Sequence, residues 1–335
     1  MRISQAYGGT DTGRRRRHNE DAYVCDPPLF AIADGMGGAQ AGEVASGLAA
    51  AALTERANGG GSGERRVSEL IQEANRRVHQ RASTDAATMG MGTTMTVALV
   101  EPDGRVAFGH VGDSRAYLLR ESRLEQLTDD HTLVAELVRR GELSPSDAEV
   151  HPQRSVITRA LGTDPDVDID TFALEGRPGD VVLLCSDGLS SMVPAATIEQ
   201  LLDQHRGDLR TAGKALIHAA NRGGGEDNIT AVLFELAEGE APEAVEPDEE
   251  TREHVVALED EDTLHPEDHV ELPPTADTMV VSAAELQAAL GPSEPAPPQA
   301  VTGPQAGLAR RILALLVIAI LIAVIVVLVW WGLAR

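Results

Sequence analysis

Acidic residues are distributed so unevenly along the 335 residues that only part of the chain can build a hydrophobic core. Asp and Glu number 35 against 24 Lys and Arg in residues 1–236, but 18 against 1 in residues 237–308. This second segment is also rich in Pro and poor in aromatic residues, so it cannot bury enough apolar surface to offset its ordering entropy. We therefore predict a folded domain over 1–236 and an acidic, Pro-rich disordered linker over 237–308.

Residues 309–335 differ again, because residues 312–333 are an uncharged run of 22 residues. About 20 helical residues span the ~30 Å hydrocarbon layer of a membrane. The run is too long and too uniformly apolar for a buried core helix, so we predict a C-terminal transmembrane anchor. Arg310 and Arg311 precede it, and the positive-inside rule then places the folded domain in the cytoplasm. The expected localisation is a tail-anchored, single-pass protein of the cell membrane.

The composition argues against some classes of function. A formal net charge of -25 opposes binding to nucleic-acid phosphates, so the four arginines at 14–17 do not indicate a nucleic-acid site. Cys25 and Cys185 are the only cysteines, which indicates a reduced intracellular chain without a disulfide framework. No apolar signal segment opens the sequence.

Residues 1–236 mix strand and helix patterns. Short apolar runs that end in turn signals predict strands, and longer alanine-rich or amphipathic stretches predict helices. The predicted strands are 29–33, 92–100, 105–110, 115–119, 168–174, 181–185 and 229–236, and the predicted helices are 42–57, 64–82, 195–204 and 209–221. This order favours an α+β fold with largely antiparallel sheets. Residues 132–161, called the insert below, are a helical piece and a loop, either a mobile flap or a long connection.

Aspartates recur where predicted strands end, at Asp34, Asp113, Asp187 and Asp227. One Asp-Gly pair is only a turn signal. Four such carboxylates at one edge of a fold would repel one another unless a cation lay between them. Oxygen ligands without His or Cys favour Mg²⁺ or Mn²⁺ over Zn²⁺.

A second acidic run, residues 164–175, imitates a calcium-binding loop. Ile169 stands at the position where that loop needs Gly for its sharp turn. Asp alternating with Val and Ile is better interpreted as a half-buried edge strand.

Six short motifs follow one another through residues 3–236: RRHNED at 16–21, DGMGG at 34–38, GMGTT at 90–94, GDSR at 112–115, SDG at 186–188 and DN at 227–228. They closely resemble, in sequence and order, the protein phosphatase 2C family of metal-dependent serine/threonine phosphatases, and its bacterial branch in particular. The resemblance implies a four-layer α/β/β/α sandwich with two central antiparallel sheets. It also implies a centre of two Mn²⁺ or Mg²⁺ ions at one edge, with a third ion in some bacterial members.

The resemblance assigns roles to the motif residues. The implied metal ligands are Glu20, Asp34, the backbone carbonyl of Gly35, Asp113, Asp187 and Asp227. Asp34 would bridge the two ions, and Asp113 with Asp187 resembles the third-ion site. Arg16 matches the arginine that binds phosphate, Asp21 would orient water, and Asn228 would support the ligands from behind. Arg16, Asp21 and Asp34 are thus the implied catalytic residues.

The implied reaction is attack of a metal-bridging hydroxide on phosphorus, without a phospho-enzyme. The best-known eukaryotic members carry His directly after the Asp-Gly, where this chain has Met36. The proton for the leaving oxygen must then come from elsewhere, such as metal-bound water. The histidine candidates are His18, His110, His131 and His151.

These features predict a membrane-tethered phosphoserine/phosphothreonine protein phosphatase that opposes serine/threonine kinases. Its expected partners are phosphorylated proteins, membrane kinases among them, and the inner membrane, but not nucleic acid. The alternative is a phosphoprotein-binding pseudophosphatase or membrane scaffold. None of the carboxylates expected of an active member is missing, which favours the enzyme.

Overall fold

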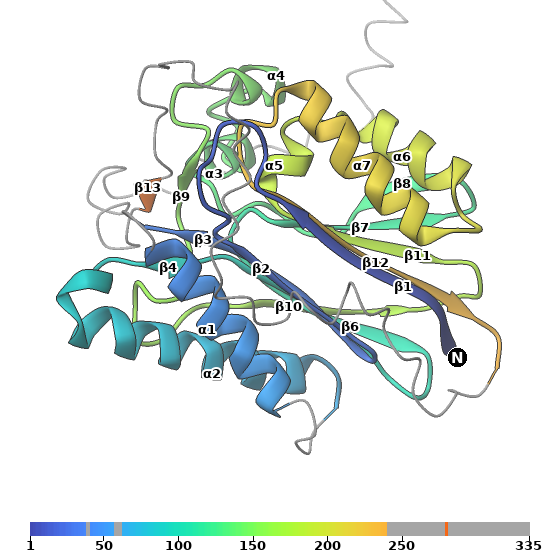
Figure 1. Cartoon of the computed structure of the whole chain (residues 1–335), viewed down its shortest axis with the longest axis horizontal. Helices are drawn as coiled ribbons and strands as arrows, with labels where there is room; N and C mark the ends of the chain where they lie inside the picture. The colour runs from blue at the N-terminus through green and yellow to red at the C-terminus, as the bar shows by residue number, and fades with distance from the viewer. Residues whose placement is uncertain (38–40, 57–61, 240–278, 281–335) are drawn as a thin grey trace, which may run out of the picture. The chain divides into compact units, whose positions relative to one another are not determined.

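Two antiparallel sheets form the centre of the computed structural model, which describes residues 1–37, 41–56, 62–239 and 279–280 (Figure 1). The first sheet has the order β1-β12-β11-β7-β8, with bounds Arg2–Asp11, Ile229–Ala237, Val181–Cys185, Arg115–Arg120 and Arg123–Gln126. The second has the order β10-β6-β5-β3-β2, with bounds Asp170–Glu175, Arg105–Val111, Met95–Val100, Leu29–Met36 and Asp21–Asp26. Short strand β4 (Gly92–Thr93) pairs with the end of β3.

Helix pairs cover the outer faces of the two sheets (Figure 1). Helices α1 (Ala41–Arg56) and α2 (Gly63–Thr84) pack on the second sheet, and α6 (Ala195–Gln204) and α7 (Leu209–Gly223) pack on the first. The remaining helical pieces are η1 (Ala86–Thr88), α3 (Leu133–Arg139), α4 (Pro145–Glu149) and α5 (Asp187–Ser190).

Three apolar clusters hold these layers together. One lies between α1, α2 and the second sheet, and another between α6, α7 and the first sheet. The third lies between the sheets, where Phe30 and Phe234 stack with ring centroids 4.2 Å apart. Burial of apolar surface is the main contribution that stabilises the fold, and here that burial lies on the faces of the sheets. The rims of the sheets can therefore carry polar groups.

The α+β fold with two antiparallel sheets predicted from the sequence is confirmed, and β10 is the predicted edge strand. The strand predicted over 92–100 is interrupted at Thr94, which separates β4 from β5. Strands β1, β2 and β8 were not among the predicted elements. Asp34 lies inside β3, because this strand continues to Met36, and not at a strand end as expected.

The insert contains α3, α4 and strand β9 (Val156–Ile157), as expected for a helical piece and loop. Met279–Val280 form β13, which pairs in parallel with β9. The rest of the predicted linker beyond Gly239 and the predicted membrane span at 312–333 lie outside the described residues. No helix within the described residues is long and apolar enough to cross a membrane.

Candidate active site

A pocket with a cavity volume of about 150 Å³ opens where the rims of the two sheets meet. That volume has room for several water molecules or a phosphoryl group. Its lining residues are Arg16, Glu20, Asp34, Gly35, Met36, Gly37, Asp113, Ile157, Asp187 and Asp227. Arg16 and all six implied metal ligands therefore face one cavity, although residues 16 and 227 are far apart in the sequence. Asp21 and Asn228 lie behind it.

The pairing of β2 with β3 brings two of these acidic residues together. Asp21 and Asp34 are direct partners across the antiparallel ladder. Oδ2 of Asp21 accepts a 2.5 Å hydrogen bond from Thr230 Oγ1 of the first sheet, whereas its buried Oδ1 has no partner. Like charges opposite each other destabilise a sheet, so this register indicates a functional requirement.

Glycines let the backbone of β3 approach Glu20 closely. The Gly35 N–H donates to the Glu20 carbonyl at 3.0 Å. A Cβ at Gly35 would lie 2.1 Å from the carbonyl oxygen of Gly42, and one at Gly42 would lie 2.8 Å from Glu20 Oε1. The first turn of α1 thus packs directly against the Glu20 carboxylate, and only Gly fits at either position.

The ends of strands β11 and β12 of the first sheet position two more carboxylates. Asp187 follows β11 and begins α5, while Asp227 immediately precedes Asn228 and β12. A Cβ at Gly188 would lie 2.1 Å from the Asn228 carbonyl oxygen, which explains the glycine of the SDG motif. The backbone N–H of Asn228 donates to Asp227 Oδ1 at 2.8 Å and so fixes that carboxylate.

Asn228 also fastens the loop that carries Arg16 and Glu20. Its Oδ1 accepts from the Glu20 N–H at 2.8 Å, and its Nδ2 donates to the carbonyls of Thr12 and His18, both at 3.0 Å. Asn228 therefore holds this loop by three hydrogen bonds.

Arg16 reaches across the pocket mouth to both sides of the acidic cluster. Its Nη2 donates to Asp227 Oδ2 at 2.8 Å, and its Nη1 lies 3.7 Å from Glu20 Oε2. The side chain is 30% exposed, so the guanidinium borders both the pocket and solvent. A planar fork of N–H donors in this position is suited to phosphoryl oxygens.

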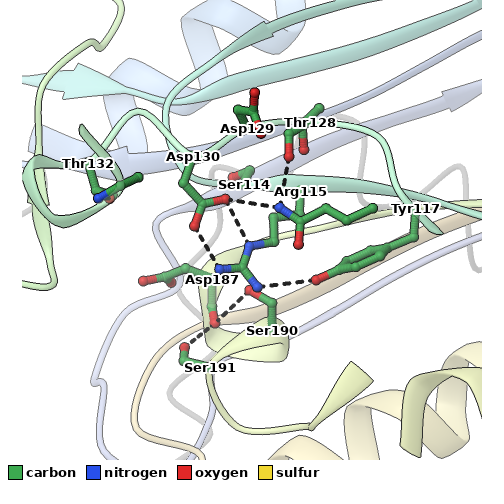
Figure 2. Close-up of polar contacts among 12 residues, drawn as sticks. Ser114, Arg115, Tyr117, Thr128, Asp129, Asp130, Thr132, Asp187, Ser190 and Ser191 are labelled. Carbon is green, nitrogen blue, oxygen red and sulfur yellow. Dashed lines mark hydrogen bonds and ion pairs between the residues drawn. The ribbon is translucent and has the colours of Figure 1, made fainter. Parts of the chain in front are cut away.

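Arg115, a half-buried arginine, supports the Asp187 side of the pocket (Figure 2). Arg115 donates to both carboxylate oxygens of Asp130, at 2.9 and 2.7 Å, and to the Tyr117 hydroxyl at 3.2 Å. Burial disfavours its charge, but the hydrogen bonds and charge of Asp130 outweigh burial and raise the pKa of Arg115. Its charge in turn opposes the rise in the pKa of Asp113 and Asp187.

Four carboxyl groups at the pocket are held in surroundings that disfavour their negative charge. Burial, reinforced by the neighbouring carboxylates, raises the pKa of Asp34 and of Asp113 well above the ordinary value. Burial likewise raises the pKa of Asp21 to about 7 and that of Asp187 to about 6. Such shifts concentrate at functional sites, where a bound cation or proton relieves the repulsion.

The donor set fits divalent cations that prefer oxygen ligands. The buried Oδ1 atoms of Asp21 and Asp187 have no hydrogen-bond partner, which is costly unless another group satisfies them. Within the described ranges, no three carboxylate, histidine or cysteine side chains are already gathered as ligands around one point. The fit therefore rests on burial, excess negative charge and unpaired oxygens, and these features match Mg²⁺ or Mn²⁺.

Thr94 links the two halves of the site, and the sequence reasoning assigned it no role. Its N–H donates to the Asp34 carbonyl at 2.9 Å, and its Oγ1 accepts from the Asp34 N–H at 2.9 Å. The same hydroxyl lies 2.8 Å from Ser114 Oγ, beside Asp113. The interruption between β4 and β5 thus provides a polar bridge. The only sequence signal for it was the paired threonine of the GMGTT motif.

None of the four candidate histidines lines the pocket among the described residues. His110 and His131 are buried, His151 is half-buried and His18 is exposed. Met36 lies in the pocket wall at the position where the eukaryotic members carry His.

Comparison with known proteins decides the family. Residues 9–233 match the family model described as protein phosphatase 2C. The chain belongs to the protein phosphatase 2C family. It is a protein phosphatase of this metal-dependent family, so the resemblance inferred from the six motifs and the enzyme class are confirmed.

Several bacterial members of the protein phosphatase 2C family are similar to this chain. The serine/threonine phosphatase stp of Listeria innocua is 41% identical over 237 residues, which cover 68% of this chain and 93% of the relative. The crystal structure of the Mycobacterium tuberculosis serine/threonine phosphatase PstP matches with a TM-score of 0.66 and 39% identity, over 70% of this chain and 100% of that chain. A structure of the PstP catalytic domain with two manganese ions matches with a TM-score of 0.64 and 36% identity, over 70% and 99%.

Proposed function

We propose that the chain hydrolyses phosphoserine and phosphothreonine in proteins at the pocket between the two sheets. The observation that carries the proposal is the combination, in one cavity, of the Arg16 guanidinium with six potential oxygen ligands. The names of the relatives stp and PstP as serine/threonine phosphatases support this substrate class.

The residues that would hold two Mn²⁺ or Mg²⁺ ions are Glu20, Asp34, the Gly35 carbonyl, Asp187 and Asp227. Asp113 together with Asp187 would hold a third. The manganese complex of PstP supports the choice of ion. Bound divalent ions would acidify water near neutral pH and neutralise the charge of the phosphoryl group.

The side chains themselves bind and orient the substrate and water. Arg16 exchanges its contact with Asp227 for the phosphoryl oxygens and stabilises the negative charge that develops on them. Asp21 keeps Oδ2 on Thr230, and its buried Oδ1, which has no hydrogen-bond partner, would orient a water held between the acidic residues. Asp34 and Asp187 concentrate negative charge where the cations would bind.

The test is phosphate release from a phosphothreonine peptide in Mn²⁺ by the purified chain and three variants. We expect Asp34→Asn and Asp187→Asn each to lower kcat/KM by at least about 100-fold, because each removes a charged oxygen ligand. Asp26→Asn, at an exposed position at the end of β2, is the matched control and should retain full activity. Retained turnover in Asp34→Asn would refute the proposal.

We further propose that the enzyme is tethered to the cytoplasmic face of the cell membrane by residues 309–335 and dephosphorylates membrane-associated proteins, serine/threonine kinases among them. The support is the 22-residue apolar run at 312–333 and the acidic linker before it. Confinement to one surface would raise the effective concentration of enzyme for such substrates. Membrane fractionation of the whole chain and of a chain ending at residue 308 tests this; recovery of both in the soluble fraction would contradict it.

A further inference from the structure

His131 stands between the loop that carries Asp113 and the insert. It lies in the connection from β8 to α3, next to Asp130, and its side chain is 0% exposed. A buried imidazole without contact with the pocket requires another explanation than proton donation to the leaving group.

Both backbone polar groups of Gly112 are bonded to His131. The Gly112 N–H donates to His131 Nδ1 at 3.0 Å, and the His131 N–H donates to the Gly112 carbonyl at 2.8 Å. Gly112 has a φ of +110°, and a Cβ there would lie 2.5 Å from Thr94 Cγ2. Since Gly112 directly precedes Asp113, these contacts fix the direction in which the Asp113 side chain leaves the backbone.

The opposite edge of the imidazole contacts a salt bridge. Because Nδ1 accepts a hydrogen bond, Nε2 carries the proton and donates to Asp170 Oδ2 at 3.0 Å. The other oxygen of Asp170, Oδ1, accepts from Arg159 Nη1 at 2.7 Å. Arg159 belongs to the insert.

The insert is joined to His131 by its backbone as well. The Thr158 N–H donates to the His131 carbonyl at 2.8 Å. Thr158 directly follows Ile157, which lines the pocket. His131 thus contacts the loop of a predicted metal ligand through its side chain, and the segment that forms part of the pocket wall through its backbone carbonyl.

A second histidine holds the imidazole in place. The His110 ring lies 4.7 Å from the His131 ring, centroid to centroid. Nδ1 of His110 lies 2.9 Å from Thr96 Oγ1, and its Nε2 lies 3.2 Å from the Asp129 carbonyl oxygen. Burial lowers the pKa of His131 to about 4, so the ring is neutral near pH 7 and its tautomer is set by its two partners.

We propose that His131 is a positioning residue: Nδ1 orients the Asp113 carboxylate through Gly112, and Nε2 connects that loop to the insert through Asp170 and Arg159. The cation-binding role of Asp113, and with it this proposal, rests on the proposed function. The two contacts use different ring nitrogens, so their effects should be separable. The Nδ1–Gly112 hydrogen bond, called the Gly112 arm, should affect cation binding at Asp113. The Nε2–Asp170 hydrogen bond, called the Asp170 arm, should affect the position of the pocket wall and therefore substrate binding.

Amide isosteres of the two ring nitrogens separate these arms. His131→Asn places an acceptor near Nδ1 and lacks the donor to Asp170, whereas His131→Gln places a donor near Nε2 and lacks the acceptor for Gly112. Mn²⁺ binding to the whole chain is measured by calorimetry. Asp113→Asn is the reference, because it should lack the Mn²⁺ ion whose binding needs Asp113. We expect His131→Gln to weaken the affinity for that ion at least tenfold, and His131→Asn to change that affinity less than twofold.

Kinetics on a phosphothreonine peptide test the Asp170 arm, and for substrate binding we expect the larger effect from His131→Asn and not from His131→Gln. We expect His131→Asn, and Arg159→Ala likewise, to raise KM severalfold with kcat changed less than twofold. Equal effects of His131→Asn and His131→Gln on Mn²⁺ binding, at matched melting temperatures, would reduce His131 to a structural role and overturn the proposal. If instead Asp113→Asn binds Mn²⁺ as the unaltered chain does, the cation role of Asp113 fails, and the proposal fails with it.

The unaltered chain provides a test that does not depend on the folding of any variant. Nitrogen-15 shifts of the histidine side chains at pH 7 should show His131 neutral, with the proton on Nε2. The Gly112 amide should be protected from hydrogen exchange. A proton on Nδ1, or an exposed Gly112 amide, would contradict the geometry on which the proposal stands.

Discussion

Asp34 illustrates how a single carboxylate in this site depends on both sheets. Both its backbone N–H and its backbone carbonyl are hydrogen-bonded to Thr94, and its partner across the ladder is Asp21. Burial raises the pKa of Asp34, and the charges of Asp187 and Asp227 raise it further. An acidic group so placed is unfavourable for folding and favourable for binding a cation.

Arg16 should contribute mainly to substrate binding. In Arg16→Ala the phosphoryl oxygens lose a charged pair of hydrogen-bond donors. We therefore expect KM for a phosphothreonine peptide to rise at least about tenfold, which corresponds to ~1.4 kcal/mol of binding free energy, with a smaller decrease in kcat. Arg14→Ala is the matched control, because Arg14 is exposed and its hydrogen bond to the Gly225 carbonyl comes from the backbone N–H and not from the side chain. Initial-rate kinetics of both variants measure KM and kcat. Equal increases in KM would contradict a specific role for Arg16.

Thr94 should contribute through its hydroxyl. Thr94→Val keeps the shape but leaves the Asp34 N–H without its hydroxyl acceptor, so we expect a loss of about 1–3 kcal/mol in the free energy of unfolding together with reduced activity. Thr94→Ser retains the hydroxyl and should stay close to the unaltered chain. Urea unfolding measures the difference. If Val and Ser destabilise equally, the hydrogen bond to Asp34 is not the cause.

The sequence motifs named the charged residues that line the pocket and the supporting Asn228, but they assigned no role to Thr94 or Thr230. Asp34, Asp187 and Arg16 belong to motifs that can be read directly. Thr230 bonds Asp21 of the other sheet, and His131 bonds Gly112 and Asp170. No local sequence pattern marks a residue whose partner is set by the packing of separate elements.

Helix α1 shows how an element positions the site. Its start packs against Glu20 and Gly35, which only a glycine at position 42 permits. Its alanine-rich sequence keeps the helix close to β3, and the same sequence made it predictable within one residue at each end. The predicted helices and strands were generally accurate because their apolar patterns are local.

A pair of glycines in α1 tests this packing. A Cβ at Gly42 would lie 2.8 Å from Glu20 Oε1, so we expect Gly42→Ala to destabilise the fold by about 1–3 kcal/mol and to raise the Mn²⁺ concentration needed for half-maximal activity. Among the described residues, and apart from the backbone of the helix itself, no atom lies within 4 Å of a Cβ at Gly47, so Gly47→Ala should stabilise the helix by about 0.5–1 kcal/mol. Thermal unfolding and Mn²⁺ titration of both variants measure these effects, and a Gly42→Ala protein as active and stable as Gly47→Ala would contradict the packing.

Elements that depend on tertiary contacts could not be predicted. The break at Thr94 exists because its backbone and hydroxyl turn toward Asp34, and the paired threonine at 93–94 is the only local sign of it. Asp34 was expected at a strand end, but β4 pairs with Gly35 and Met36 and extends β3 past it. The linker and membrane predictions rest on composition alone and stay predictions.

The whole molecule should respond to pH through its excess of buried carboxyl groups. Without metal, the folded state holds protons on Asp21 up to about pH 7 and on Asp187 up to about pH 6, whereas the unfolded chain releases them near pH 4. The folded state therefore binds more protons between about pH 4 and 7, and the free energy of unfolding falls as pH rises, by about 1.4 kcal/mol per pH unit for each extra proton.

Divalent cations should reverse this trend, because they replace the protons. We expect the melting temperature in a chelator to fall from pH 5 to pH 8, and Mn²⁺ to raise it more at pH 8 than at pH 5. Asp187→Asn, which removes one of the titrating groups, should show a shallower fall. A metal-free melting temperature that rises over this range in the unaltered chain and in Asp187→Asn alike would contradict the raised pKa values.

The central claim is that the pocket between the sheets becomes a phosphatase centre when oxygen ligands such as Asp34 and Asp187 bind divalent cations. The most direct measurement is phosphate release from a phosphothreonine peptide while Mn²⁺ is titrated into the metal-free chain. We predict no turnover without metal, saturable turnover with Mn²⁺, and none at any Mn²⁺ concentration for Asp34→Asn. Full turnover in a chelator, or an Asp34→Asn titration that matches that of the unaltered chain, would contradict the account.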